Sequence, residues 1–260
     1  MIVLGFDTAT ASTAVGLRDA AGATVELRDD PPPGAHPGHA TRLLAMTGEL
    51  LASRGIGWQA VDRIAVGVGP GTFTGLRVGV ATARGLAQSL RADLVGVSSL
   101  RALAANALGP ISAEEPHPAA DPSWAARGVL AVLDARRGEV FMAAYSLATS
   151  PATPGALREL LGARALPPAE LEGAIGRIGG ASRPPGGAWL ALGDGAVRYR
   201  EYLLGAGAMV PPDDSDAHRI SAGAVCDLGA AGEPLAGARQ LEPDYGRRPD
   251  AEIALEGVSS

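Results

Sequence analysis

Two aspartates stand where a chain could hold a metal-bound phosphate. Asp7 follows the apolar run at residues 2–6, and Asp134 follows the apolar run at residues 128–133. Carboxylates at strand ends are good oxygen ligands for a magnesium ion that carries a phosphate. The same residue type is equally common in polar turns, because its side chain can bond the backbone two residues further on. Both interpretations stay open at this point.

A glycine-rich stretch, GVGPGTFTGLRVG at residues 67–79, overlaps and follows a third apolar run at residues 64–68. It has no P-loop lysine, and its spacing GxGxxxG from Gly69 is one residue too long for the dinucleotide fingerprint. What remains is a helix N-terminus, whose free N–H groups attract anions. We favour a plain strand-to-helix turn in which Thr72 or Thr74 caps the helix.

The rest of the chain offers no catalytic constellation. His36 and His39 are separated by Pro-Gly, which excludes a helical metal motif, and His117 lies in a proline-rich segment. His39 begins a helix, where the dipole disfavours its cation, so we expect a neutral hydrogen-bonding or interface role. There is no GxSxG nucleophile elbow and no lysine anywhere in the sequence. We predict no catalytic residue and no metal site.

Composition narrows the class further. The net charge of −6 argues against a self-sufficient nucleic-acid binder, which needs a basic surface. Cys226 is the only cysteine, so a disulfide framework and a multi-cysteine zinc site are excluded. No apolar stretch approaches the ~20 residues that span a bilayer, and the opening MIVLGF is too short for a signal-peptide core. We expect a cytoplasmic protein.

Apolar periodicity predicts an α/β protein built from two similar halves. The predicted strands cover residues 2–6, 13–17, 24–27, 64–68, 94–97, 128–133, 139–147 and 189–192. The predicted helices cover residues 39–54, 74–90, 100–107, 156–161, 168–175, 197–204 and 220–231. Residues 109–127 are interpreted as a connection. The succession of strand, aspartate, polar turn and strand occurs at Asp7 and again at Asp134, which suggests a duplicated architecture.

The helix predicted over residues 74–90 carries two rows of small residues. One row is Gly75, Gly79, Ala83 and Ala87, and the other is Ala81 and Gly85. A glycine inside a helix costs about 1 kcal/mol relative to alanine, so these rows indicate close approach by another element. That element is either a partner subunit or a neighbouring part of the same chain.

Several segments together resemble the TsaB (YeaZ) family. They are IVLGFDTATASTAVGL from residue 2, HATRLLAM from residue 39, GVGPGTFTGLRVGVATARGLA from residue 67, GVSSL from residue 96 and LDARRGEVFMAAY from residue 133. A closing segment, LEPDYGRR at residues 241–248, is similar to the family's Glu-Pro-x-Tyr-x-Arg ending. Residues 149–240 contribute little to the resemblance.

The resemblance implies an actin/Hsp70/sugar-kinase-like (ASKHA) fold with two similar α/β lobes and mixed sheets. The first lobe would comprise residues 1–108, completed by residues 220–248, and would bind the partner. Residues 109–219 would form a second, degenerate lobe, and residues 249–260 a flexible tail.

The resemblance also implies the role of a non-catalytic partner of TsaD, supporting threonylcarbamoyl transfer to adenosine 37 of tRNA. Metal and ATP or threonylcarbamoyl-adenylate would be held by TsaD, and this chain would have no cofactor of its own beyond weak ATP binding. TsaE would join the larger complex, and tRNA would be reached through that complex. A homodimer in the absence of TsaD is left open.

Two sets of site residues follow from the resemblance. The expected partner interface comprises His39, Leu43, Leu44, Met46, Leu50, Gly75, Leu76, Gly79, Val80, Ala83, Leu86 and Ala87. The expected degenerate nucleotide cleft comprises Asp7, Thr8, Thr10, Gly69, Gly71, Thr72, Asp134, Gly193 and Gly195.

Two other functions are weighed against this one. An active ATP-dependent transferase or sugar kinase of the same superfamily would need a phosphate turn and an adenosine loop, for which residues 7–9 and 193–195 are partial substitutes. An M22-type peptidase would need a pair of metal-binding histidines, which the sequence lacks.

Overall fold

The structure is a computed structural model that describes residues 1–32, 34–107, 128–147, 157–178 and 189–247. The predicted connection at 109–127 and the predicted tail at 249–260 lie outside the described residues. Within the described part, no helix is long and apolar enough to cross a membrane.

The first sheet has five strands in the order β3-β2-β1-β4-β5. Their bounds are β1 Val3–Asp7, β2 Thr13–Arg18, β3 Thr24–Asp29, β4 Arg63–Gly69 and β5 Asp93–Ser98. Strands β1, β2 and β3 form an antiparallel meander, whereas β4 pairs parallel to β1 and β5 parallel to β4. The predicted three-strand meander is confirmed, and the sheet is mixed.

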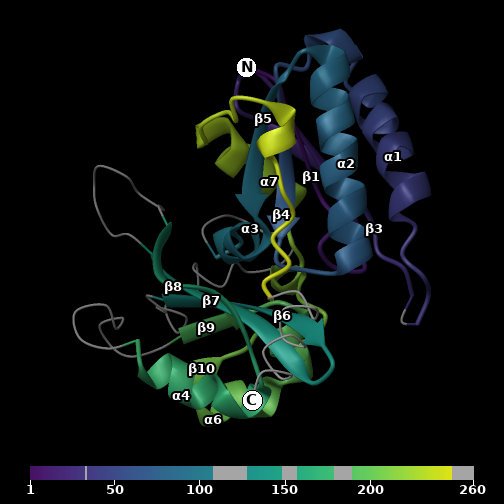
Figure 1. The fold of residues 1–260 in the computed structure, drawn as a ribbon. Helices are drawn as coiled ribbons and strands as arrows, with labels where there is room; N and C mark the ends of the chain where they lie inside the picture. Colours follow the sequence, from purple (N-terminus) through teal and green to yellow (C-terminus); the bar gives the residue numbers. More distant parts are fainter. Residues whose placement is uncertain (33, 108–127, 148–156, 179–188, 248–260) are drawn as a thin grey trace, which may run out of the picture.

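Helices cover both faces of this sheet (Figure 1). On one face, α1 (His39–Ser53) and α2 (Phe73–Leu90) lie side by side and bury Leu43, Val80 and Ala83 among the apolar residues of β1, β2 and β4. On the other face lies α7 (Ala222–Ala231), whose Val225 and Cys226 pack with residues of β1, β4 and β5. Helix α7 comes from the C-terminal part of the chain, so both ends of the sequence build one lobe.

The second sheet repeats this plan with the order β10-β9-β6-β7-β8. Its strands are β6 Gly128–Arg136, β7 Glu139–Leu147, β8 Leu157–Leu166, β9 Trp189–Leu192 and β10 Ala208–Met209. Again three consecutive strands form a meander, and the next strand, β9, pairs parallel to the first of them. The duplication predicted from Asp7 and Asp134 is therefore confirmed, and both aspartates belong to the first strand of their sheet.

Short helices complete the second lobe and the connections. The α-helices are α4 Leu171–Gly176, α5 Asp194–Arg198 and α6 Arg200–Gly205, and the 3₁₀ helices cover Trp58–Ala60, Pro168–Glu170, Asp216–His218 and Ala238–Gln240. The helix predicted over 197–204 is thus two helices that meet at Tyr199, and the first begins three residues earlier than predicted.

The prediction of a short helix over residues 156–161 is wrong. Residues 157–161 of this segment begin β8, which pairs antiparallel with β7. Leucine, alanine and arginine favour a helix locally, but a helix here would leave the outer edge of β7 without hydrogen-bond partners. Tertiary pairing overrides local propensity, and Leu157 and Leu166 become buried ends of the strand.

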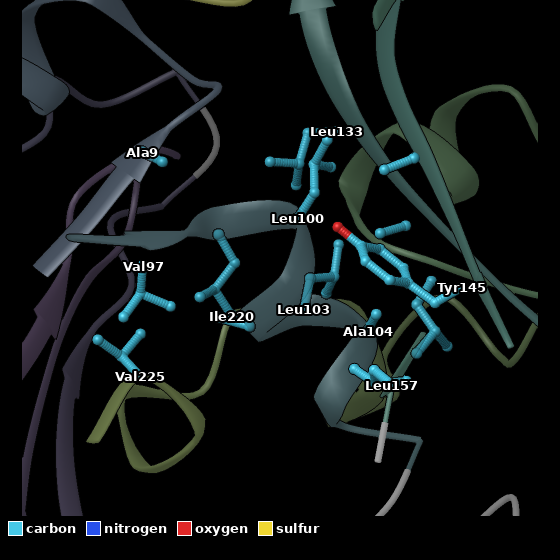
Figure 2. Packing of buried hydrophobic residues seen from close by; sticks show 14 of the residues in the cluster. Ala9, Val97, Leu100, Leu103, Ala104, Leu133, Tyr145, Leu157, Ile220 and Val225 are labelled. Carbon is cyan, nitrogen blue, oxygen red and sulfur yellow. The ribbon is translucent and has the colours of Figure 1, made fainter. Parts of the chain in front are cut away.

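Helix α3 (Ser99–Ala105) joins the two lobes. Figure 2 shows Leu100, Leu103 and Ala104 of this helix facing Leu133, Tyr145 and Leu157 of the second lobe. All of these side chains belong to one buried cluster that also contains Val225 of α7. The lobes therefore share a continuous apolar core.

Candidate interaction surface and interlobe cleft

A cavity of about 480 Å³ lies between the lobes. The turn after β1 contributes Thr10 and Ser12, and the second lobe contributes Asp134, Asp194 and several arginines. Of the nine residues predicted for a degenerate nucleotide cleft, only Thr10 and Asp134 line this cavity. The other seven predicted residues do not line the cavity, and most of the residues that do line it were not predicted.

Asp134 is neutralised by the protein's own cations. Its side chain is 5% exposed, and Oδ2 lies 3.2 Å from Arg136 Nη1 and 3.1 Å from Arg198 Nη1. Its Oδ1 accepts the backbone N–H of Arg136. A carboxylate paired with two guanidinium groups is a poor ligand for a phosphate-bearing metal, because the cations already occupy its lone pairs. Among the described residues, no group of three or more acidic, histidine or cysteine side chains could hold a metal ion.

Asp7 is a buried anchor. Its side chain accepts hydrogen bonds from Ser99 Oγ at 2.6 Å and from the backbone N–H of Ala9 at 2.7 Å. Burial raises the pKa of this carboxyl group above its ordinary value. Ser99 Oγ also accepts the N–H of Gly69, so the three groups tie the ends of β1 and β4 to the start of α3. Asp7 does not line the cavity.

The glycine-rich stretch approaches protein backbone. A Cβ atom on Gly75 would lie 2.0 Å from the carbonyl oxygen of Thr8, and one on Gly79 would lie 2.5 Å from Thr8 Oγ1. Thr8 Oγ1 donates to the Gly75 carbonyl at 2.8 Å. These contacts leave no room for a side chain. We conclude that Gly75 and Gly79 are small so that the turn after β1 can pack closely against helix α2.

The remaining predicted cleft residues also serve packing. The backbone N–H of Thr72 donates to the Ala9 carbonyl, and a Cβ atom on Gly71 would clash with that same carbonyl. Thr72 is the N-cap residue of α2, but its side chain makes no capping hydrogen bond, so the predicted cap is only half right. In the second lobe, the N–H of Gly193 donates to His218 Nδ1, and Gly195 lies against the backbone of Leu133.

Most of the predicted interface residues point into the chain's own core. The buried ones are His39, Leu43, Met46, Leu50, Gly75, Leu76, Gly79, Val80, Ala83 and Ala87. Leu86 is partly buried, and Leu44 is exposed. A buried side chain cannot contact a second protein directly. For the row that contains Gly79, the close neighbour is therefore the chain itself.

The opposite row of α2 faces outward. Phe73, Arg77, Ala81 and Gly85 follow one another at intervals of four and are all exposed, and nothing lies within 4 Å of a Cβ atom built on Gly85. Phe73 is 55% exposed, and Leu44 on the adjacent helix α1 is 50% exposed. We call these five residues the outer helical face. Ala81 and Gly85 were visible in the sequence as a second small-residue row, whereas nothing in the sequence distinguished Phe73.

An aromatic contact closes one end of the outer helical face. The rings of Phe73 and Tyr245 stack with centroids 5.1 Å apart, and the Arg77 guanidinium lies 3.9 Å from the centroid of the Phe73 ring. Arg77 Nε also donates to the Tyr245 hydroxyl at 3.1 Å. Tyr245 is 172 residues away from Phe73, a pairing that no local pattern could predict.

His39 is the first residue of helix α1 and is buried. It is 3% exposed, and its Nδ1 forms a hydrogen bond with Thr13 Oγ1 at 2.8 Å. Burial lowers the pKa of its imidazole. The expected neutral, hydrogen-bonded role is therefore supported, whereas its own burial argues against direct contact with a partner.

Comparison with known proteins extends over most of the chain. A family model described as TsaD, tRNA N6-adenosine threonylcarbamoyltransferase, matches residues 31–156. The tRNA threonylcarbamoyladenosine biosynthesis protein TsaB of Escherichia coli (strain K12) is 34% identical over 148 residues, 56% of this chain and 55% of that protein. The solved structure of YeaZ from Pseudomonas aeruginosa superimposes with a TM-score of 0.68 at 27% identity, covering 94% of this chain and 99% of that one.

In sequence and in structure, the chain is similar to TsaB (YeaZ) proteins. The TsaB protein of Haemophilus influenzae is 39% identical over 103 residues, 40% of this chain and 38% of that protein. In sequence, the chain thus matches about half of its curated relatives' length or less. In structure, the match to YeaZ extends over both lobes.

Proposed function

We propose that this chain acts in tRNA threonylcarbamoyladenosine biosynthesis as the non-catalytic partner of a TsaD-type threonylcarbamoyltransferase. The observation that carries the proposal is the similarity of the chain to curated proteins named TsaB, whose names refer to this pathway. The chain would work in the cytoplasm and reach tRNA through the complex, which TsaE would also join.

The residues of the interlobe cleft support a non-catalytic role for this chain. Asp7 is withdrawn into the core, and Asp134 is held by Arg136 and Arg198. Neither aspartate is available to orient a metal-bound triphosphate, which phosphoryl-transfer sites require. The metal ion and the ATP or threonylcarbamoyl-adenylate would be bound by TsaD, and this chain would need no cofactor.

The outer helical face supports a helical docking partner. Exposed small residues at Ala81 and Gly85 allow the axis of another helix to approach α2 closely, and Leu44 and Phe73 supply apolar area beside them. The TsaD model matches residues 31–156, a span that contains α1 and α2. A TsaD-type partner is therefore expected to carry the same two helices, so that the pairs can pack against each other around a pseudo-twofold axis.

Light scattering after size exclusion tests this function, using the chain alone and mixed with TsaD of the same organism. We expect a one-to-one complex, and we expect it to form threonylcarbamoyladenosine on tRNA faster than TsaD alone. Ala81→Arg should weaken the complex at least about tenfold, because it places a long charged side chain at the centre of the contact.

Ala163→Arg is the matched control, since Ala163 is exposed on β8 in the second lobe. It should bind like the wild-type chain. A homodimer of the isolated chain that also breaks with Ala81→Arg would show that both assemblies use one face. The proposal is wrong if no complex forms with TsaD, and tight binding of ATP by the isolated chain would then favour an activity of its own.

A further inference from the structure

The last described segment, Leu241–Arg247, crosses from the first lobe to the second, and we call it the C-terminal strap. It begins beside α2, where the Leu241 carbonyl accepts a hydrogen bond from Arg84 and the Leu241 side chain is 2% exposed. The Asp244 N–H then donates to the Val68 carbonyl at 2.7 Å, which fixes the strap to the end of β4.

In the middle of the strap, Tyr245 contacts the outer helical face. Tyr245 stacks on Phe73 and accepts the hydrogen bond from Arg77 Nε, so a single strap residue contacts two members of that face. A phenylalanine that is 55% exposed in the first turn of a helix would otherwise sample several rotamers. Held between Tyr245 and Arg77, it keeps one orientation before any partner arrives.

The end of the strap is bound to the second lobe. Arg247 Nη2 donates to the Ala135 carbonyl at 3.1 Å and forms an ion pair with Glu139, and its guanidinium lies over the Phe141 ring. Gly246 has a φ of +62° and packs between Phe141 and Pro70, where a Cβ atom would lie 2.7 Å from the phenylalanine ring. Only Gly246 separates Tyr245, which contacts the outer helical face, from Arg247, which is bound to the second lobe.

We infer that the C-terminal strap is a positioning device: it preorders Phe73 and Arg77 for docking and makes their geometry depend on the β6–β7 hairpin of the second lobe. The inference rests on the proposed function, because the docked partner is the TsaD-type protein proposed above. Preordering an anchor side chain raises affinity by removing the entropy cost of fixing it on binding.

The decisive variant is Arg247→Ala, because Arg247 touches the second lobe and none of the five residues of the outer helical face. We expect it to speed hydrogen exchange of the amides at residues 74–77 in the isolated chain, and to weaken TsaD binding about three- to tenfold. Arg158→Ala, an exposed arginine on β8, should change neither quantity.

A double-mutant cycle separates positioning from general loosening. Phe73→Ala alone should weaken TsaD binding at least about tenfold, as loss of an anchor residue does. In the Phe73→Ala background, Arg247→Ala should cost clearly less affinity than it does in the wild-type chain, since one of the two side chains that the strap orders has been removed. Independent, additive losses would mean that the strap only stabilises the fold, and would overturn the inference.

The exchange measurement uses the chain without a partner, so it distinguishes this inference from the proposed function. If wild-type chain forms no complex with TsaD, the proposed function fails and the docking role of the strap fails with it. If the complex forms and Phe73→Ala weakens it, while Arg247→Ala changes neither exchange nor affinity, the proposed function stands and the inference is wrong. Faster exchange with unchanged affinity would also overturn it.

Discussion

Gly79 and Gly85 lie in the same helix, but they should respond in opposite ways to the same change. In Gly85→Ala the new methyl group meets nothing within 4 Å, so only helix propensity changes. Replacing a helical glycine by alanine is worth about 1 kcal/mol. For a chain of this size, that gain should raise the melting temperature by about 2–4 °C.

Gly79→Ala receives the same propensity gain but adds a methyl group 2.5 Å from Thr8 Oγ1. Thr8 is fully buried, and its hydroxyl is already bonded to the Gly75 carbonyl, so it has no free space into which to move. Overpacking of a buried site costs about 1–3 kcal/mol, and loss of the hydroxyl hydrogen bond costs about 1 kcal/mol more. We expect a net loss of roughly 1–3 kcal/mol.

Urea unfolding followed by tryptophan fluorescence measures both variants against the wild-type chain. The free energies of unfolding of the two variants should differ by roughly 2–4 kcal/mol, with equal slopes against urea concentration. If Gly79→Ala is as stable as Gly85→Ala, the tight approach of Thr8 to α2 is wrong. The assignment of the Gly79 row to the chain's own core would then fall with it.

Three further predictions concern burial, pH and nucleotide. Arg63→Met should lower the free energy of unfolding, measured in urea, by about 3 kcal/mol, because Arg63 Nη1 donates hydrogen bonds to the carbonyls of Gly229, Ala230 and Gly232 at the end of α7. The matched control, Arg164→Met at an exposed position, should leave the free energy of unfolding almost unchanged. Burial lowers the pKa of His39 and His218, so the unfolded chain binds protons more readily around the ordinary value of 6.5. Stability should therefore fall as the pH drops through that value, and the decline should be smaller in a His39→Gln/His218→Gln chain when unfolding is measured at about pH 7.5 and about pH 5.5. Millimolar MgATP should raise the melting temperature by less than about 1 °C, and a rise of several degrees would show that the cleft holds nucleotide despite its ion pairs.

Local patterns were sufficient to predict most of the architecture, because β1, β4, β6 and the long helices are strongly apolar and periodic. The duplication was suggested by the strand, aspartate and turn at Asp7 and again at Asp134, and the family resemblance pointed to the same two-lobe architecture. The error at β8 has a different origin. Its sequence favours a helix, and only the unpaired edge of β7, formed elsewhere in the chain, makes it a strand.

The two aspartates show why the cleft could not be predicted at the level of residues. In sequence Asp7 and Asp134 look alike, yet one is buried on Ser99 and the other is paired with Arg198, which are 92 and 64 residues away. A strand and a turn place a carboxylate, but distant side chains decide whether it can bind a ligand. The same limit applies to α2, where two rows of small residues give no indication of which row faces the core.

The glycine-rich stretch is the sharpest case of this limit. Strand, glycine turn and helix also describe loops that cradle phosphate, since such a loop must let a ligand approach the backbone closely. Here the carbonyl of Ala9 lies close to Gly71 and that of Thr8 lies close to Gly75, as a phosphate oxygen would in a phosphate-binding loop. The requirement for glycine is therefore the same whether the approaching group is a ligand or the protein's own turn. Only the identity of that group separates a binding site from a packing contact, and in this chain the backbone of residues 8 and 9 fills the place.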